Sequence, residues 1–151
     1  MKKLYVILLF SVFASCAAPK LIQIDSIEKT FKAPGDKTEL YIKANNWMVE
    51  NFTNAKSVIQ FSDKEEGIVT GKYFLRRSHT LRSGLTSTFA IIKLEVKDYS
   101  SKITITPEAF YAHSSAIYQE NFRYKLGDVE KEIENLILSY EEYLNRPTDQ
   151  W

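Results

Sequence analysis

The strictest alternation in the chain lies at residues 86–97, and it limits the folds that the sequence can adopt. Its apolar residues at every second position are Ala90, Ile92, Leu94 and Val96. A period of two is that of a β-strand with one buried face. The polar residues 98–102 then lead directly into another strand-like stretch. Strands joined by short turns predict an antiparallel meander.

The same criteria predict strands on both sides of this one. The first is expected at residues 24–32, with Ile27 and Phe31 pointing inward, and Pro34 and Gly35 end it. The other four are expected at residues 57–62, 68–77, 86–97 and 103–111. The loop expected at residues 78–85 carries His79, Arg82 and Gly84.

Two amphipathic helices are predicted. Asp36 has the place of an N-cap, and Glu39 completes a capping box three residues later. The apolar stripe of this helix is Leu40, Ala44, Trp47, Met48 and Phe52. A second helix is expected to begin at Asp128 and to end before Pro147. Its stripe is Val129, Ile133, Leu136, Ile137, Tyr140 and Leu144. Such stripes at helical spacing predict one buried face per helix.

The resulting order is β-α-β-β-β-β-α, which indicates the α+β class. Two helices that each bury one stripe are best accommodated on one face of the sheet. We therefore expect a two-layer domain, with an antiparallel sheet of about five strands and both helices on one face. The absence of repeats and interior linkers predicts a single domain at residues 24–146.

The N-terminus has the pattern of a secretory signal peptide. Lys2 and Lys3 precede an apolar stretch, and small residues precede Cys16, the only cysteine of the chain. Residues 13–16 resemble the lipobox of bacterial lipoproteins. The prediction is a lipoprotein signal peptide at residues 1–15 and a lipidated N-terminus with a tether at residues 16–23. A plain signal peptide cut elsewhere and an uncleaved membrane helix are the alternatives, although the apolar stretch is shorter than the roughly 20 residues of a membrane span.

The lipobox resemblance implies that Cys16 carries fatty acyl groups such as palmitate. Two or three such chains anchor a protein firmly, whereas one anchors it marginally. Some bacterial lipoproteins that are sent to the cell surface have acidic residues soon after the cysteine, and here no acid precedes Asp25. We therefore expect a cell-envelope protein in the inner leaflet of the outer membrane, facing the periplasm, with the membrane as one partner.

Charge and cysteine content exclude several classes of function. Loss of Lys2 and Lys3 with the signal peptide lowers the 20 basic residues to 18, against 19 acidic residues. This balance lacks the basic surface that nucleic-acid binding requires, so no nucleic-acid partner is expected. Once Cys16 is acylated, no thiol remains for a disulfide or a cysteine-ligated metal.

Several residues outside the signal peptide resemble a known family. They are Phe31, Pro34-Gly35, Glu39-Leu40-Tyr41, Ala44, Trp47, Val58-Ile59-Gln60 and Gly67-Ile68-Val69-Thr70-Gly71-Lys72. The chain resembles a Bacteroidetes lipoprotein family built on a domain of unknown function with a TATA-box-binding-protein-like (TBP-like) fold. The resemblance implies this fold and a cell-envelope location, but no activity and no catalytic residue. Although the namesake of the fold binds DNA, a shared fold does not fix function.

No catalytic or metal-binding motif follows from the sequence. His79 and His113, the only histidines, lie far apart, and neither has a second ligand at useful spacing. The acids Asp63, Glu65 and Glu66 fit a solvated turn better than a calcium loop, which needs more oxygen ligands. We expect no enzyme, no metal and no cofactor. The alternative is an envelope hydrolase that uses His79 or His113.

The second face of the sheet is the candidate binding surface. If Ala90, Ile92 and Leu94 face the helices, their neighbours along the strands face away. The predicted surface consists of Lys72, Phe74, Arg76, Phe89, Ile91 and Lys93. A mixed apolar and basic surface on an uncovered sheet suits another envelope protein or a ligand, neither of which the sequence identifies. The alternatives are that a C-terminal loop covers this face, or that it is an ordinary surface with scattered apolar atoms.

Overall fold

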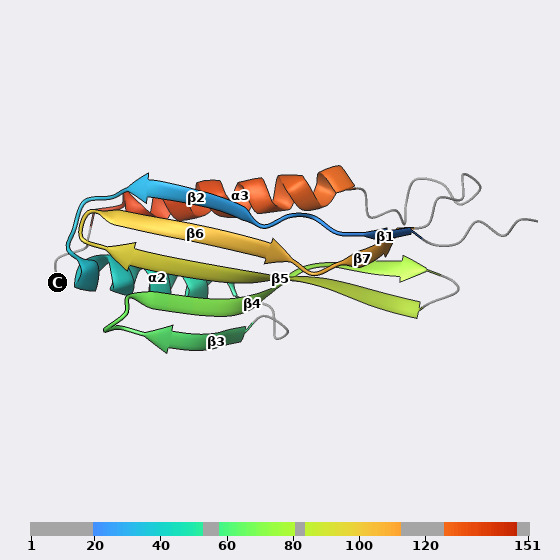
Figure 1. Cartoon of the computed structure of the whole chain (residues 1–151), viewed down its shortest axis with the longest axis horizontal. Coiled ribbons are helices and arrows are strands. Elements are labelled where there is room, and N and C mark those ends of the chain that lie inside the picture. Colours follow the sequence, from blue (N-terminus) through green and yellow to red (C-terminus); the bar gives the residue numbers. More distant parts are fainter. Residues whose placement is uncertain (1–19, 53–57, 81–83, 113–125, 148–151) are drawn as a thin grey trace, which may run out of the picture.

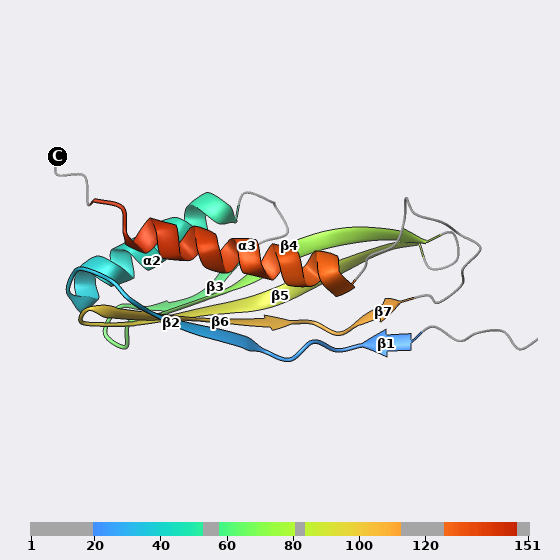
Figure 2. The ribbon, with the colours of Figure 1, turned by 90° about the horizontal axis from the view of Figure 1, so that it is seen from above.

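The computed structural model describes residues 20–52, 58–80, 84–112 and 126–147. Within them, a five-stranded antiparallel sheet with the order β2-β6-β5-β4-β3 carries two helices on one face (Figures 1 and 2). The strands are β2 (Ile27–Lys32), β3 (Val58–Asp63), β4 (Ile68–Thr80), β5 (Gly84–Lys97) and β6 (Ser100–Pro107). The helices are α2 (Lys37–Asn51) and α3 (Leu126–Leu144). The expected α+β class and two-layer arrangement are confirmed.

Helix α2 starts at the predicted N-cap. The Asp36 carboxylate accepts a hydrogen bond from the N–H of Glu39 at 2.9 Å, which satisfies one of the free donors of the first turn. The Lys37 N–H donates to the Asp98 carboxylate at 2.8 Å, and the Tyr99 N–H donates to the Gly35 carbonyl at 3.0 Å. These bonds attach the start of α2 to the turn between β5 and β6.

The core lies between the sheet and the helices, and Tyr140 of α3 is at its centre. Its ring centroid lies 5.0 Å from that of Trp47 and 6.1 Å from that of Phe31. Its hydroxyl is 2.6 Å from the Ser101 hydroxyl, and burial raises the pKa of Tyr140 above its usual range. Helices α2 and α3 and strands β2 and β6 therefore all meet around the Tyr140 ring.

The residues of β5 that were predicted to point inward are all buried, so the alternation was interpreted correctly.

A buried lysine donates hydrogen bonds to carbonyl groups at the end of α3. Lys43 of α2 is buried, and its ammonium donates to the carbonyls of Leu144 and Arg146, at 2.9 Å each. The last carbonyls of a helix have no partner within the helix, and a cation near them also compensates the helix dipole. Lys43 therefore ties the two helices together.

Replacement of this lysine should destabilise the domain. Lys43→Met keeps the aliphatic stem but leaves the two carbonyls without their donor, so we expect the free energy of unfolding to fall by about 1–3 kcal/mol. Urea unfolding followed by circular dichroism measures the change. Lys131→Met, at an exposed position of α3, is the control and should change stability by less than about 0.5 kcal/mol. Equal stability of the two variants would show that the buried contacts of Lys43 contribute nothing.

The ends of the predicted sheet are wrong in two places. The expected tether contains strand β1 (Lys20–Ile22), which pairs with β7 (Phe110–Ala112) in a separate two-stranded sheet. The single strand expected at residues 103–111 is divided, because β6 ends at Pro107 and β7 begins three residues later. Proline lacks the N–H that a ladder needs, so it favours a break. The β1–β7 pair joins segments distant in sequence and leaves no local periodic signal.

The loop expected at residues 78–85 is shorter in the structure than predicted. β4 continues to Thr80 and β5 resumes at Gly84, with the Cα partners running from Arg76↔Thr88 to Thr80↔Gly84. Beyond the bulge between Phe74 and Arg76, no third strand from the described part of the chain pairs with this hairpin. β3 pairs with β4 only as far as Lys72, and β6 pairs with β5 only as far as Ala90. We call the paired residues 76–80 and 84–88 the arm. Helix α3 begins at Leu126, two residues before its expected cap at Asp128.

Candidate functional site: the open face of the sheet

The face of the sheet opposite the helices carries most of the predicted binding residues. In the β4–β5 ladder, Phe74 stands opposite Phe89, and Lys72 stands opposite Ile91. Lys93 follows opposite Thr70, which belongs to the same face. All of these side chains are partly exposed, whereas their neighbours Ala90, Ile92 and Leu94 are buried. The register thus brings together Lys72, Phe74, Phe89, Ile91 and Lys93, which we call the open face.

Lys72 is held in place among the aromatic residues. Its ammonium lies 4.3 Å from the centroid of the Phe89 ring and 2.7 Å from a carboxylate oxygen of Glu108. The Phe74 and Phe89 rings meet edge to face, with centroids 5.6 Å apart. A cation over a ring face and an edge-to-face ring pair are both attractive contacts. They fix a basic group in an aromatic surface before any partner binds.

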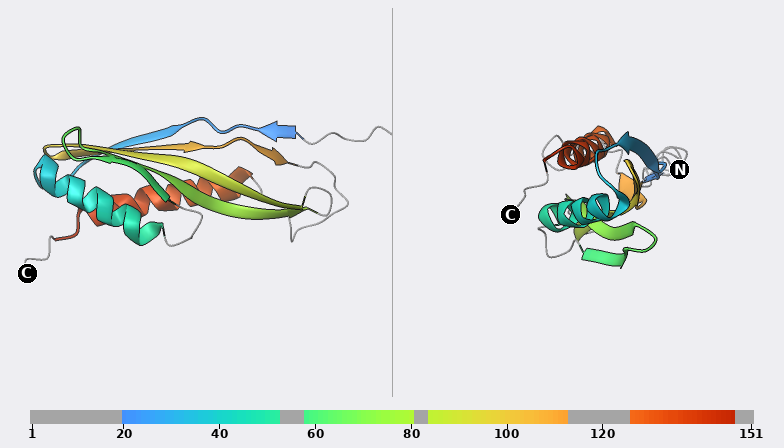
Figure 3. Two further views of the ribbon diagram at one scale, coloured as in Figure 1. Left: turned by 90° about the horizontal axis from the view of Figure 1, so that it is seen from below. Right: turned by 90° about the vertical axis from the view of Figure 1, so that its left-hand side faces the viewer.

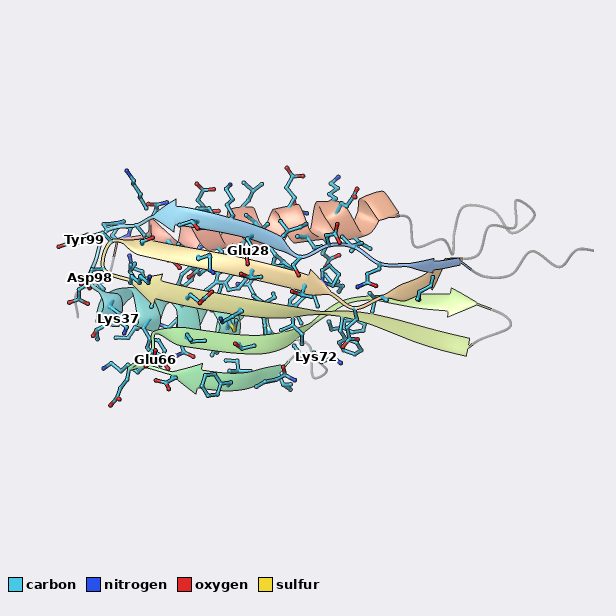
Figure 4. All side chains as sticks on the ribbon, viewed as in Figure 1. Glu28, Lys37, Glu66, Lys72, Asp98 and Tyr99 are labelled. Atoms are coloured by element: carbon cyan, nitrogen blue, oxygen red, sulfur yellow. The ribbon has the colours of Figure 1, made fainter. Side chains whose placement is uncertain are left out.

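The other half of this face is polar. Glu95 pairs with Lys102 at 2.7 Å and with Lys93 at 3.1 Å. The hydrogen bond from Lys102, more than any other contact, lowers the pKa of the Glu95 carboxyl below its usual range. Thr104 of β6 donates to the Glu28 carboxylate of β2 at 3.2 Å (Figure 4). The face therefore changes from aromatic near Phe74 to ionic near Lys102.

Two apolar residues of β3 extend the aromatic half and were not predicted from the sequence. Val58 stands opposite Lys72 and Phe61 stands opposite Thr70, so both belong to the open face. Their side chains are 49% and 53% exposed, more than is usual for apolar residues of this size. A β-bulge between Ile59 and Phe61 breaks the alternation of β3 and hides this pattern in the sequence.

The second bulge separates Arg76 from the rest of the predicted surface. Arg76 stands opposite Thr88, whereas Phe74 stands opposite Phe89, so one residue of β4 is extra at this point. The period-two alternation that grouped Arg76 with Phe74 therefore does not continue past the bulge. Arg76 belongs to the arm.

The structure describes only some of the residues named for the alternative function and for the lipid anchor. His79 lies in the β4 half of the arm, and His113 and Cys16 lie outside the described residues. Among the residues whose placement is described, no group of three histidine, cysteine or carboxylate side chains is arranged to hold a metal ion. None of the described helices is both long enough and apolar enough to cross a membrane. The Asp63 carboxylate accepts hydrogen bonds from the N–H groups of Glu65 and Glu66, as in a turn.

This fold and sequence match one protein family. Residues 28–107, more than half of the chain, match the family described as a domain of unknown function (DUF4468) with TBP-like fold. The chain belongs to the DUF4468 family. This confirms the domain and the fold that the sequence resemblance implied, while the lipoprotein part of that resemblance stays a prediction. No curated protein matches the chain.

Two solved structures are similar to this DUF4468 protein. One is a TBP-like protein from Parabacteroides distasonis, with 12% identity and a TM-score of 0.54, covering 79% of this chain and 91% of that one. The other is a DUF4468 family protein from Bacteroides ovatus, with 16% identity and a TM-score of 0.44, covering 84% of this chain and 91% of that one. At such identity the likeness to the first structure supports the fold alone.

Proposed function

We propose that this DUF4468 protein is a non-catalytic interaction module of the cell envelope, anchored by acyl groups on Cys16. It faces the periplasm from the inner leaflet of the outer membrane and binds another envelope protein through the open face. The observation that carries the proposal is an apolar surface around the fixed ammonium of Lys72, formed by the exposed Val58 and Phe61 and the partly exposed Phe74 and Phe89.

The chemistry of this surface suits binding rather than catalysis. Aromatic residues supply large contact areas and dominate the energetics of protein interfaces. Lys72 is already engaged by Glu108 and the Phe89 ring, so it contributes a positioned charge and not a free nucleophile. The ion pairs of Glu95 form a polar border beside the aromatic half, as at the rim of an interface.

Charging the open face should remove partner binding without unfolding the domain. Ile91→Glu and, separately, Phe61→Glu should each reduce capture of the partner from envelope extracts by at least tenfold, because each places a carboxylate within the apolar contact. Phe61 is the more exposed position, so its substitution should change stability by no more than about 0.5 kcal/mol. The measurement is an affinity pull-down of the lipoprotein followed by mass spectrometry, with thermal unfolding in parallel.

The matched control is Leu138→Glu, which introduces the same charge at an exposed apolar position of α3. It should leave capture unchanged. If Phe61→Glu and Ile91→Glu both fold and still capture the same proteins as the unmodified chain, the open face is not the binding surface. A large loss of melting temperature for Ile91→Glu alone would show that a partner cannot reach this position. The capture measured with Phe61→Glu then tests whether the open face is the binding surface.

A further inference from the structure

The arm projects past the body of the domain toward the end where β1 lies. Figures 1 and 3 show the end of β4, the start of β5 and strand β1 at the same end of the long axis, and the start of α2 at the opposite end. Ile68 and Thr80 are twelve residue-to-residue steps apart along β4, so Thr80 lies about 40 Å from the turn that precedes this strand. A two-stranded hairpin is at best marginally stable alone, so an arm of this kind is suited to contact something outside the domain.

Charge is unevenly distributed along this axis. From Gly67 to Leu94 the sequence has no acidic residue, and Arg76 and Arg77 both lie in the described part of the arm. The opposite end carries acids and bases together, among them Glu66, Asp98 and Lys37, which Figure 4 shows near the start of α2. The arm is thus a basic segment without acids, whereas the opposite end has charges of both signs.

The short link to Cys16 places the same end near the lipid anchor, if Cys16 is acylated as proposed above. Four residue-to-residue steps lead from Cys16 to Lys20, the first residue of β1. Fully extended, they span at most about 14 Å. β1 therefore cannot lie farther than this from the acylated cysteine, whatever path the link follows.

We infer that the β4–β5 arm rests on the membrane that holds the anchor, with its basic end against anionic phospholipid headgroups. The inference rests on the proposed lipidation, and it is supported by the length of the link and by the charge of the arm. Basic residues close to an anionic bilayer are attracted to it, and this attraction is screened by salt. The bound orientation directs the α2 end and the β3–β4 turn away from the bilayer.

Fluorescence quenching tests this orientation in the mature lipoprotein. Acylation leaves no free thiol in the chain, so Thr80→Cys supplies a unique labelling site at the arm tip, and Glu65→Cys supplies the matched control at the far end. Each labelled protein is reconstituted into vesicles of phosphatidylethanolamine and phosphatidylglycerol that contain a headgroup-spin-labelled lipid. The Thr80 label should be quenched at least threefold more than the Glu65 label, and the difference should shrink at high salt.

The charge requirement is tested by a second pair of variants. Arg76→Glu with Arg77→Glu should abolish the excess quenching of the Thr80 label. Lys97→Glu with Lys131→Glu, the same charge change at exposed positions outside the arm, should preserve it. Circular dichroism confirms that each variant is folded, and the wild-type comparison of the two labels decides the orientation even if the arginine variant does not fold.

The outcomes separate the orientation from the anchor on which it rests. Mass spectrometry of the purified protein first determines whether Cys16 is acylated. An acylated protein with equal quenching of both labels overturns the membrane-facing arm and leaves the proposed function intact. An unmodified Cys16 overturns the anchor itself, and the orientation falls with it.

Discussion

Cys16→Ala should yield a protein without lipid that is absent from the outer-membrane fraction. The thiol is the proposed acyl acceptor, and alanine offers no nucleophile for thioether formation. Since each buried methylene contributes about 0.8 kcal/mol to membrane affinity, loss of all acyl chains removes the whole anchor. Mass spectrometry of the intact N-terminus and immunoblots of cell fractions measure the effect. The expected product is either uncut precursor or soluble protein.

The unmodified protein and a Ser15→Ala variant, which keeps a small residue before the cysteine, are the controls for this experiment. Both should fractionate with the outer membrane and resist protease added to whole cells, as expected for the inner leaflet. Digestion of the unmodified protein without cell lysis would place it on the cell surface instead. A mature N-terminus at any residue other than Cys16, without acyl groups, would refute the lipoprotein prediction.

Trp47→Ala should cost about 3–5 kcal/mol of unfolding free energy, as large aromatic truncations in cores do. Trp47 is fully buried, its ring lies against Tyr140, and its indole N–H donates to the Ser139 hydroxyl at 2.8 Å. The substitution leaves a cavity between α2 and α3 and an unpaired hydroxyl. Since domains of this size are stable by only about 5–15 kcal/mol, the variant loses a substantial part of that stability. Thermal unfolding should show a midpoint roughly 10–20 °C lower.

Leu138→Ala, at an exposed position of the same helix pair, serves as the control and should shift the midpoint by no more than a few degrees. Trp47→Phe separates the two contributions, since it keeps most of the ring contact but loses the hydrogen bond to Ser139. A midpoint for Trp47→Ala within a few degrees of the unmodified protein would contradict the central place given to this side chain in the core.

The parts of the fold that sequence reasoning anticipated are those with a local signal. Helix α2 follows from the Asp36 cap and a stripe with helical spacing, and β5 follows from uninterrupted alternation. The same alternation anticipated that Phe89, Ile91 and Lys93 lie opposite the helices. In each of these cases the residues that determine the structure are close together in the sequence.

What sequence reasoning missed depends on pairing between distant residues or on an extra residue in a strand. The β1–β7 pair joins Lys20 to Ala112, and neither strand has a pattern of its own. Bulges in β3 and β4 shift the period by one residue, which concealed Phe61 and wrongly extended the alternation to Arg76. Glu108, the partner of Lys72, follows Pro107 and lay inside a strand predicted to be continuous.

The position of Tyr140 has a consequence for the timing of folding. Its ring and hydroxyl contact Phe31, Trp47 and Ser101. These residues belong to β2, α2 and β6, which all precede α3 in the chain, so the core cannot form without α3. Under the proposed export, the chain crosses the inner membrane with its N-terminus first, and α3 emerges after the other described elements. The core therefore cannot close until α3 has crossed the membrane. Cys16 emerges while the domain is still unfolded, so acyl transfer to its thiol can precede folding without competing with it.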